Sequence, residues 1–194
     1  MGGNLSRLWV TGYRSYELGI FDNHDKKRDV INYVLRKEIT AEIENGVDWI
    51  ITGGQMGIEQ WTIEAANSLK SEYPDEFQVS MMVPFAEFSG HWNENNQAIY
   101  NQIKSQVDFF ASTSNQPYNS PQQLRNYQEF MINHTDSALL VYDLDNPGKT
   151  QYDYNVIKNY ADKHPYPYRL ITFDDLQSAA EEYFESLNNG FQDE

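Results

Sequence analysis

Two kinds of hydrophobic pattern alternate along the chain. One is a short, continuous run of apolar residues, and the other is a longer stretch in which apolar residues recur every three or four positions, as on one face of an α-helix. The runs predict strands over residues 8–11, 49–52, 79–83, 107–111, 138–142 and 170–173. The periodic stretches predict helices over about residues 31–43, 58–69, 93–106, 124–131, 151–162 and 176–187.

This alternation of strand and helix predicts an α/β fold. Strands that are apolar throughout are buried on both faces, and helical connections make consecutive strands parallel. We therefore expect one Rossmann-like, doubly wound domain over residues 1–194, with a mainly parallel sheet, helices on both faces and a frayed tail from about residue 188. Such sheets bind ligands beyond the carboxyl ends of their strands, where the strand order reverses. The loops that follow the strands are therefore where chemistry is expected.

Composition narrows the classes of function. The chain has 194 residues, no cysteine, and 14 Lys and Arg against 29 Asp and Glu, which gives a formal net charge of −15. The lack of cysteine excludes disulfides and thiol nucleophiles, and the four scattered histidines predict no metal site. The acidic excess argues against a nucleic-acid partner, which needs basic side chains opposite its phosphates. Without a membrane-length apolar stretch or a leader, a cytoplasmic protein is expected.

The most distinctive polar segment is the glycine-rich turn of residues 52–59. Gly53, Gly54 and Gly57 join a predicted strand to a predicted helix, and glycine lets the backbone turn tightly and approach a ligand closely. The free N–H groups at the start of that helix suit a phosphate. The dinucleotide fingerprint is absent, and a tight turn without a ligand is the alternative. Glu59 is either a ligand contact or a complement to the helix dipole.

Two further loops contain candidate binding residues. Gly12 and Arg14 follow the first strand, where a guanidinium can grip a phosphate or carboxylate at two points, although a surface ion pair is the alternative. Gly148 and Thr150 belong to a Pro-Gly-Lys-Thr turn that lacks the upstream glycine of a P-loop. Thr150 and Asp153 are spaced as an N-cap and its third helical residue, which favours a structural role.

Arg125 and Asn126, on the helix before the strand at 138–142, form a fourth candidate site. An exposed helical arginine is the alternative for Arg125. Aromatic residues in the loops, such as Tyr13 and Phe88, can stack on a base, but simple packing is the favoured role for each of them. Tyr127 is expected in the core.

Together these segments resemble the YpsA-like family of bacterial proteins, within the SLOG superfamily. Its relatives include the DNA-processing protein DprA and the LOG-type "lysine decarboxylase-like" nucleotide phosphoribohydrolases. The resemblance is carried by Thr-Gly-Tyr-Arg at 11–14, Glu-Leu-Gly-Ile-Phe at 17–21, Gly-Gln-Met-Gly-Ile-Glu-Gln-Trp at 54–61, Val-Pro-Phe at 83–85, Tyr-Asn-Ser-Pro at 118–121 and Ile-Thr-Phe-Asp-Asp-Leu at 171–176. It implies a Rossmann-like fold that binds a nucleotide-derived ligand between two glycine-bearing turns, and a homodimer.

The wider superfamily resemblance is looser. Gly53, Gly54 and Gly57 resemble its first turn, and Arg125, Asn126 and Met131 resemble the arginine-bearing helix of the LOG-type enzymes. The hydrolase turn of those enzymes reads Pro-Gly-Gly-x-Gly-Thr-x-x-Glu. Residues 147–153 lack two of its glycines and carry Asp153 in place of the glutamate, so the resemblance implies a ligand site more than a reaction.

Three functions stay open on this basis. The leading hypothesis is binding or sensing of a nucleotide or nucleotide-sugar, such as NAD, ADP-ribose or a nucleoside monophosphate, with no cofactor required. Arg14 and Gly54 would then face one anion site. The second is hydrolysis of a nucleotide N-glycosidic bond, with Glu59 or Asp153 as the catalytic acid/base. The third is a regulatory protein-interaction module with a vestigial pocket.

Overall fold

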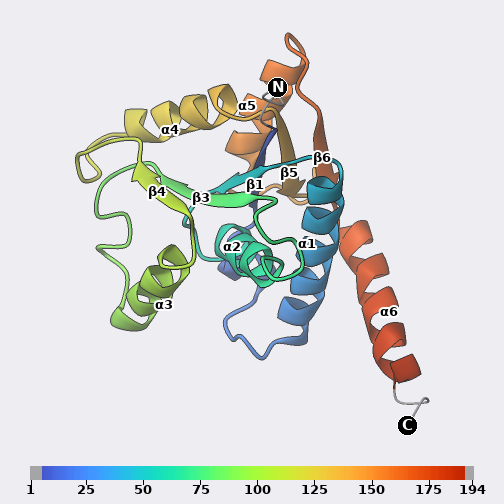
Figure 1. Ribbon diagram of the computed structural model, residues 1–194. Helices are drawn as coiled ribbons and strands as arrows, with labels where there is room; N and C mark the ends of the chain where they lie inside the picture. The colour runs from blue at the N-terminus through green and yellow to red at the C-terminus, as the bar shows by residue number, and fades with distance from the viewer. Residues whose placement is uncertain (1–5, 191–194) are drawn as a thin grey trace.

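The computed structural model describes residues 6–190, and the prediction of a doubly wound α/β fold is confirmed. Within those residues, six strands form one sheet in the order β4-β3-β2-β1-β5-β6, and every neighbouring pair is parallel (Figure 1). The strands are Arg7–Gly12 (β1), Trp49–Thr52 (β2), Gln78–Val83 (β3), Phe109–Ser112 (β4), Ser137–Val141 (β5) and Tyr168–Ile171 (β6). The strand order reverses at β1, which has β2 on one side and β5 on the other.

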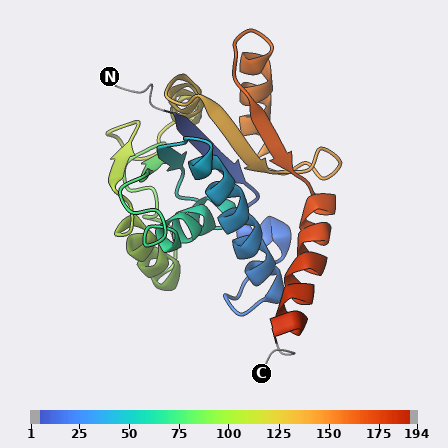
Figure 2. The same cartoon turned by 45° about the vertical axis from the view of Figure 1, so that its right-hand side comes forward.

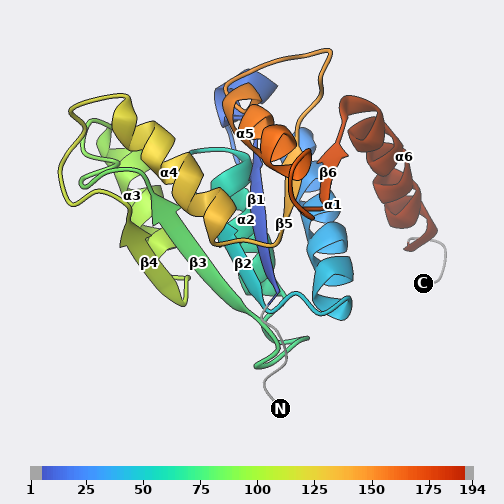
Figure 3. The ribbon, with the colours of Figure 1, turned by 90° about the horizontal axis from the view of Figure 1, so that it is seen from above.

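Helices connect the strands and cover both faces of the sheet. On one face lie α1 (Lys26–Glu44), α2 (Ile58–Ser68) and α3 (Glu94–Lys104), and on the other lie α4 (Gln122–Asn133) and α5 (Gln151–Ala161), as Figures 1 and 3 show. The last helix, α6 (Phe173–Gly190), packs beside α1 near the β6 edge (Figure 2). A short 3₁₀ helix, η1 (Ser15–Leu18), interrupts the loop that follows β1.

The core is built from the inner strands, as their continuous apolar runs predict. Trp9 of β1, Ile50 of β2, Met81 of β3 and Leu140 of β5 are each at most 1% exposed. Burying a large apolar side chain contributes about 1.5–3 kcal/mol, so these strands fix the sheet firmly. Their carboxyl ends are therefore rigid supports for the loops that follow them.

The edge strands differ slightly from the prediction. β4 begins at Phe109 instead of residue 107, because the backbone N–H of Asp108 donates to the Val79 carbonyl while its carboxylate accepts the Val79 N–H. β6 ends at Ile171, since the N–H of Phe173 bonds to the Asp143 carboxylate at 3.0 Å and opens α6. β4 therefore begins two residues later and ends one residue later than predicted, and β6 lies two residues earlier.

The C-terminal helix extends further than the sequence pattern indicates. The sequence predicts fraying from about residue 188, but α6 continues to Gly190. The rest of the predicted tail, residues 191–194, lies outside the described residues, as do residues 1–5 at the other end of the expected domain.

The loops after β1 and β2 are joined through their backbones. The N–H of Ser15 donates to the Met56 carbonyl, and the N–H of Ile58 donates to the Tyr13 carbonyl, both at 3.1 Å. Gly57 has a φ of 117°, and a Cβ built there would lie 2.5 Å from both Ser15 N and Tyr13 O. Only glycine adopts this conformation readily and permits so close an approach.

Replacing Gly57 by alanine is expected to lower the free energy of unfolding more than replacing Gly46 does. Both glycines have a left-handed φ, 117° and 100°, so alanine at either position adds strain of about 1–3 kcal/mol. No described atom lies within 4 Å of a Cβ at Gly46, whereas the Cβ at Gly57 meets the loop after β1. Urea unfolding of the two variants measures the difference, and equal losses would show that the contact between the loops accommodates a methyl group.

Candidate functional site

A cavity of about 350 Å³ lies at the carboxyl ends of β1, β2 and β3, beside the first turns of α4 and α5. Its lining consists of Arg14, Gly54, Gln55, Glu59, Pro84, Phe88, Pro121, Leu124, Arg125, Tyr127, Gln128, Lys149, Tyr152 and Asp153. The size and position are typical of small-molecule sites in doubly wound sheets. A larger hollow of about 410 Å³, between α1 and α6, contains none of the residues that the sequence analysis assigned to a site.

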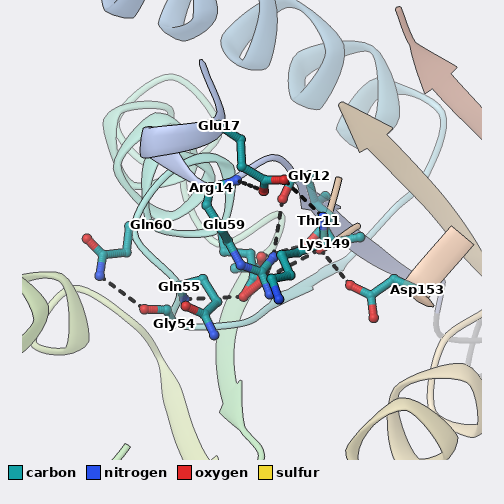
Figure 4. A network of polar contacts seen from close by, with 12 residues as sticks. Thr11, Gly12, Arg14, Glu17, Gly54, Gln55, Glu59, Gln60, Lys149 and Asp153 are labelled. Carbon is teal, nitrogen blue, oxygen red and sulfur yellow. Dashed lines mark hydrogen bonds and ion pairs between the residues drawn. The ribbon is translucent and has the colours of Figure 1, made fainter. Parts of the chain in front are cut away.

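A buried carboxyl group, Glu59, and a half-buried one, Asp153, line this cavity and meet at one hydroxyl group. The Oε1 atom of Glu59 accepts the N–H of Gln55 at 3.2 Å, and its Oε2 lies 3.3 Å from Thr11 Oγ1. The Oδ1 atom of Asp153 accepts the Gln128 amide at 2.8 Å, and its Oδ2 lies 3.1 Å from the same Thr11 oxygen. Figure 4 shows Thr11 at the end of β1 with Glu59 and Asp153 beside it. Residues from β1, α2 and α5 thus form one polar cluster.

Burial raises the pKa of both carboxyl groups, because the charged form loses its water. For Glu59 the guanidinium of Arg14, whose Nη1 lies 3.9 Å from Oε2, opposes this rise, and the charge of Asp153 adds to it. For Asp153 the hydrogen bond from Gln128 opposes it most. Burial and the two nearby carboxyl groups also hold the pKa of Tyr127 well above its ordinary value. Burial therefore favours the protonated form of each of these acidic groups.

Gly53 leaves the space that the carboxyl cluster occupies. A Cβ built at Gly53 would overlap Oε1 of Glu59 and lie 2.8 Å from the hydroxyl oxygen of Tyr127. Glycine is needed at position 54 for a different reason, since a Cβ built at Gly54 would lie 2.6 Å from Met81 Cε in the core. Neither glycine has a left-handed φ, so both positions require glycine for space and not for backbone conformation.

Three basic side chains border the same cavity. Arg14 comes from the loop after β1, Arg125 from the first turn of α4, and Lys149 from the turn before α5. The Arg125 guanidinium is held by Gln122 Oε1, which accepts from Nε and Nη2 at 3.2 and 2.9 Å. In a chain with 14 basic and 29 acidic residues, this grouping gives the cavity a local attraction for anions.

Carboxylates of the protein itself bind three backbone N–H groups of the turns. Glu17 on η1 accepts the N–H of Arg14 and the N–H of Lys149, each at 2.9 Å (Figure 4). In the glycine turn, Glu59 accepts the N–H of Gln55. These three N–H groups are therefore not free to hold the phosphate that the sequence predicts at the turns.

Tyr13 connects the loop after β1 to the loop after β5. Its hydroxyl accepts the N–H of Asp143 at 2.9 Å and donates to the Asn146 carbonyl at 2.7 Å. Its ring is 3% exposed and stacks on Phe173 at a centroid distance of 5.3 Å. Tyr13 therefore packs inside the protein, as the sequence analysis favoured, and is not free to stack on a base.

The structure brings part of the predicted site together. The cavity lining contains Arg14, Gly54, Glu59, Arg125 and Asp153. The other candidates lie beside it or elsewhere: Gly53 behind the carboxyl cluster, Gly12 against Ile58, Gly57 in the contact between the loops, Gly148 against Glu17, Asn126 exposed on α4, and Thr150 fully buried. These remaining positions shape the loops around the cavity.

The capping role predicted for Thr150 and Asp153 is wrong. The Thr150 side chain makes no capping hydrogen bond, and its hydroxyl has no hydrogen-bond partner among the described residues. Asp153 turns instead toward Thr11 and Gln128.

Sequence reasoning missed Thr11, Tyr127 and Gln128 as site residues. Thr11 reads as part of a strand, and Tyr127 was expected in the core. One signal was available, because Gln128 follows Leu124 by four residues and so shares its helix face. A polar residue on a face that is otherwise apolar indicates a buried polar partner.

The structure adds two findings on membranes and metals. Between residues 6 and 190, no helix is both long and apolar enough to cross a bilayer. The same residues contain no group of three or more His, Asp or Glu side chains placed to hold a metal ion.

Comparison with known proteins gives close relatives over nearly the whole chain. The family model YpsA, described as the YspA SLOG family, matches residues 8–176. A UPF0398 protein of Lactiplantibacillus plantarum is 59% identical over 187 residues, which cover 96% of this chain and 98% of that protein. A UPF0398 protein of Levilactobacillus brevis is 56% identical, with 97% and 99% covered.

The stability difference between Glu59→Gln and the wild type is expected to change with pH. A raised pKa means that the folded protein binds this proton more tightly than the unfolded chain does, so the contribution to stability is present at low pH and lost as the pH rises through the raised pKa. Glutamine does not ionise. The variant should therefore gain free energy of unfolding relative to the wild type from about pH 4 upward.

Urea unfolding at a series of pH values measures this difference. Glu185→Gln, which changes an exposed carboxylate on α6, is the matched control and should give a difference that changes much less with pH. A difference for Glu59→Gln as flat as that of the control would show that Glu59 ionises freely in the folded protein.

Proposed function

This chain belongs to the YpsA SLOG family, and we propose that it binds a nucleotide or nucleotide-sugar in the cavity at the carboxyl ends of β1, β2 and β3. The observation that supports this most is the meeting of three basic side chains with a buried carboxyl cluster in one cavity. Basic groups suit the phosphate of such a ligand, and carboxylates suit its ribose hydroxyls. The resemblance of the sequence to the LOG-type nucleotide phosphoribohydrolases is in keeping with this chemistry.

In this proposal the phosphate contacts Arg14, Arg125 and Lys149. The ribose hydroxyls donate to Glu59 and Asp153, where buried acceptors discriminate strongly against ligands that leave them unpaired. NAD, ADP-ribose and nucleoside monophosphates all contain this ribose-phosphate unit. The homodimer and the cytoplasmic location expected from the sequence stay predictions.

The base has an apolar surface available at the rim of the same cavity. Tyr152 is 58% exposed and Leu124 is 43% exposed, although both line the cavity. An exposed aromatic ring beside a polar cavity favours stacking with a planar ligand group. The rim therefore fits the third part of a nucleotide.

A second candidate function is hydrolysis of the N-glycosidic bond of a nucleotide. It is favoured by two carboxyl groups of raised pKa in one cavity, an arrangement that serves general acid/base chemistry. Asp153 or Glu59 would protonate the leaving base or assist the attacking water. The third function, a regulatory protein-interaction role with an unused cavity, remains if no ligand binds.

A thermal-shift panel of nucleotides, dinucleotides and nucleotide-sugars tests the binding proposal. A ligand at 100 times its Kd stabilises the folded state by about 2.7 kcal/mol, which raises the Tm measurably. Arg14→Gln is expected to weaken the best ligand about 10–150-fold, because a charge-assisted contact contributes about 1.5–3 kcal/mol. Calorimetric titration gives the two affinities.

The matched control is Lys163→Gln, which makes the same change of charge beyond the far end of α5. It should leave the affinity unchanged. Arg14→Gln also lowers stability, because it removes the cation nearest the buried carboxylate of Glu59, so titrations belong well below the Tm of the variant. Equal affinity of wild type and Arg14→Gln would remove Arg14 from the ligand site, and a panel without any shift would contradict binding altogether.

Incubation with nucleoside monophosphates, followed by chromatography for free base, tests the hydrolase. We expect Asp153→Asn and Glu59→Gln each to abolish any base release if these carboxyl groups act as acid and base. Ligand binding without base release would exclude this reaction for the panel and leave the binding proposal intact.

A further inference from the structure

A single hydroxyl group stands between the carboxyl groups of Glu59 and Asp153. Thr11 is 1% exposed, and its Oγ1 lies 3.3 Å from Glu59 Oε2 and 3.1 Å from Asp153 Oδ2 (Figure 4). A hydroxyl donates one proton, and an ionised carboxylate donates none. If both carboxyl groups were ionised, one of these contacts would set oxygen lone pairs against each other. Both contacts are full hydrogen bonds only when one carboxyl group is protonated.

We propose that Glu59, Thr11 and Asp153 form a proton relay, in which the two carboxyl groups share one proton at neutral pH. In its resting form, protonated Asp153 Oδ2 donates to Thr11 Oγ1, and the Thr11 hydroxyl donates to ionised Glu59 Oε2. When the relay reverses, Asp153 passes its proton to Thr11 while Thr11 passes its own to Glu59. One proton moves from Asp153 to Glu59, and the total charge stays at minus one.

The surroundings of each carboxyl group decide where the proton rests. Glu59 accepts the N–H of Gln55 at 3.2 Å and has Arg14 Nη1 3.9 Å from Oε2, and both favour its ionised form. Asp153 has the neutral amide of Gln128, at 2.8 Å, on its other oxygen, and the charge of Arg14 acts on it more weakly than that hydrogen bond does. The charge therefore settles on Glu59 and the proton on Asp153.

The charged groups around the relay also favour one proton on the pair of carboxyl groups. Arg14 faces the relay from the loop after β1, Tyr127 faces it from α4, and Lys149 borders the same cavity. The raised pKa of Tyr127 keeps its hydroxyl neutral at pH 7. Among the described residues, Arg14 is the one cation that forms an ion pair with the relay, so one carboxylate has a partner, whereas a second ionised carboxylate would have none.

The relay would allow the negative charge of the pair to rest on either carboxyl group. Asp153 and Glu59 both line the cavity. A ligand group that donates to Glu59 favours the resting form, and one that donates to Asp153 favours the reversed form. The relay needs no ligand to exist, so its test is independent of the proposed function.

The experiment is an NMR titration of the side-chain carboxyl carbons in the ligand-free full chain. Glu59→Gln and Asp153→Asn assign the two signals by their disappearance. In the wild type we expect two separate steps, with one carboxyl group of the pair still protonated at pH 7. Two carboxyl groups that are both ionised at pH 7 would overturn the proposal.

Variants of Thr11 test its part as the positioning residue. Thr11→Ser keeps the hydroxyl and should keep the separation between the two steps, while Thr11→Val keeps the shape without the hydroxyl. We expect Thr11→Val to bring the steps closer by about one pH unit, a tenfold change in proton affinity. A Thr11→Val titration identical to that of the wild type would show that the hydroxyl carries no proton between the carboxyl groups.

Asp153→Asn gives a second readout that does not depend on the folding of Thr11→Val. The asparagine amide donates to Thr11 Oγ1 as the protonated Asp153 does in the relay, so the titration of Glu59 should stay at its lower wild-type step. If Asp153 is ionised in the wild type, the same substitution removes a negative charge and lowers the pKa of Glu59 by about one unit or more. A clear lowering would therefore contradict the relay.

Discussion

The backbone contact between the loops after β1 and β2 is the constraint on which the rest of the site depends. Gly57, with its φ of 117°, lets the Tyr13 carbonyl accept the first N–H of α2. This contact brings Arg14 near Glu59 and places both at the strand-order reversal beside β1. The hydroxyl of Tyr13 then fixes the loop after β5. Three loops that are distant in sequence thus share one anchor point.

Carboxylates of the protein bind several backbone N–H groups of its turns. Glu17 and Glu59 accept N–H groups that in many doubly wound proteins face a ligand phosphate. These bonds hold the loops together. Three basic side chains border the cavity that the loops enclose, in a chain with a formal charge of −15.

The sequence predicts the fold well because its inner strands are apolar throughout and its helices are clearly periodic. The edge strands were misplaced by two residues, since Asp108 and Asp143 end or begin elements through contacts with distant backbone groups. The rule that ligands bind at strand carboxyl ends was enough to place Arg14, Glu59 and Asp153 near one another. It could not reveal Thr11 as their bridge, because a buried threonine in a strand has the same sequence pattern whether or not it bonds to carboxyl groups.

The start of α5 has consequences for how the site assembles. Thr150 does not cap this helix, and the preceding N–H, of Lys149, is bound by Glu17 from the other end of the chain. The turn before α5 is thus held by a residue that lies 132 positions earlier in the chain. Bringing two such distant segments together costs conformational entropy, and the contacts between them offset that cost only once they have formed. The segment that carries Lys149 and Asp153 is therefore tied to the cooperative folding of the whole domain, and a half-formed site has little chance to persist on its own.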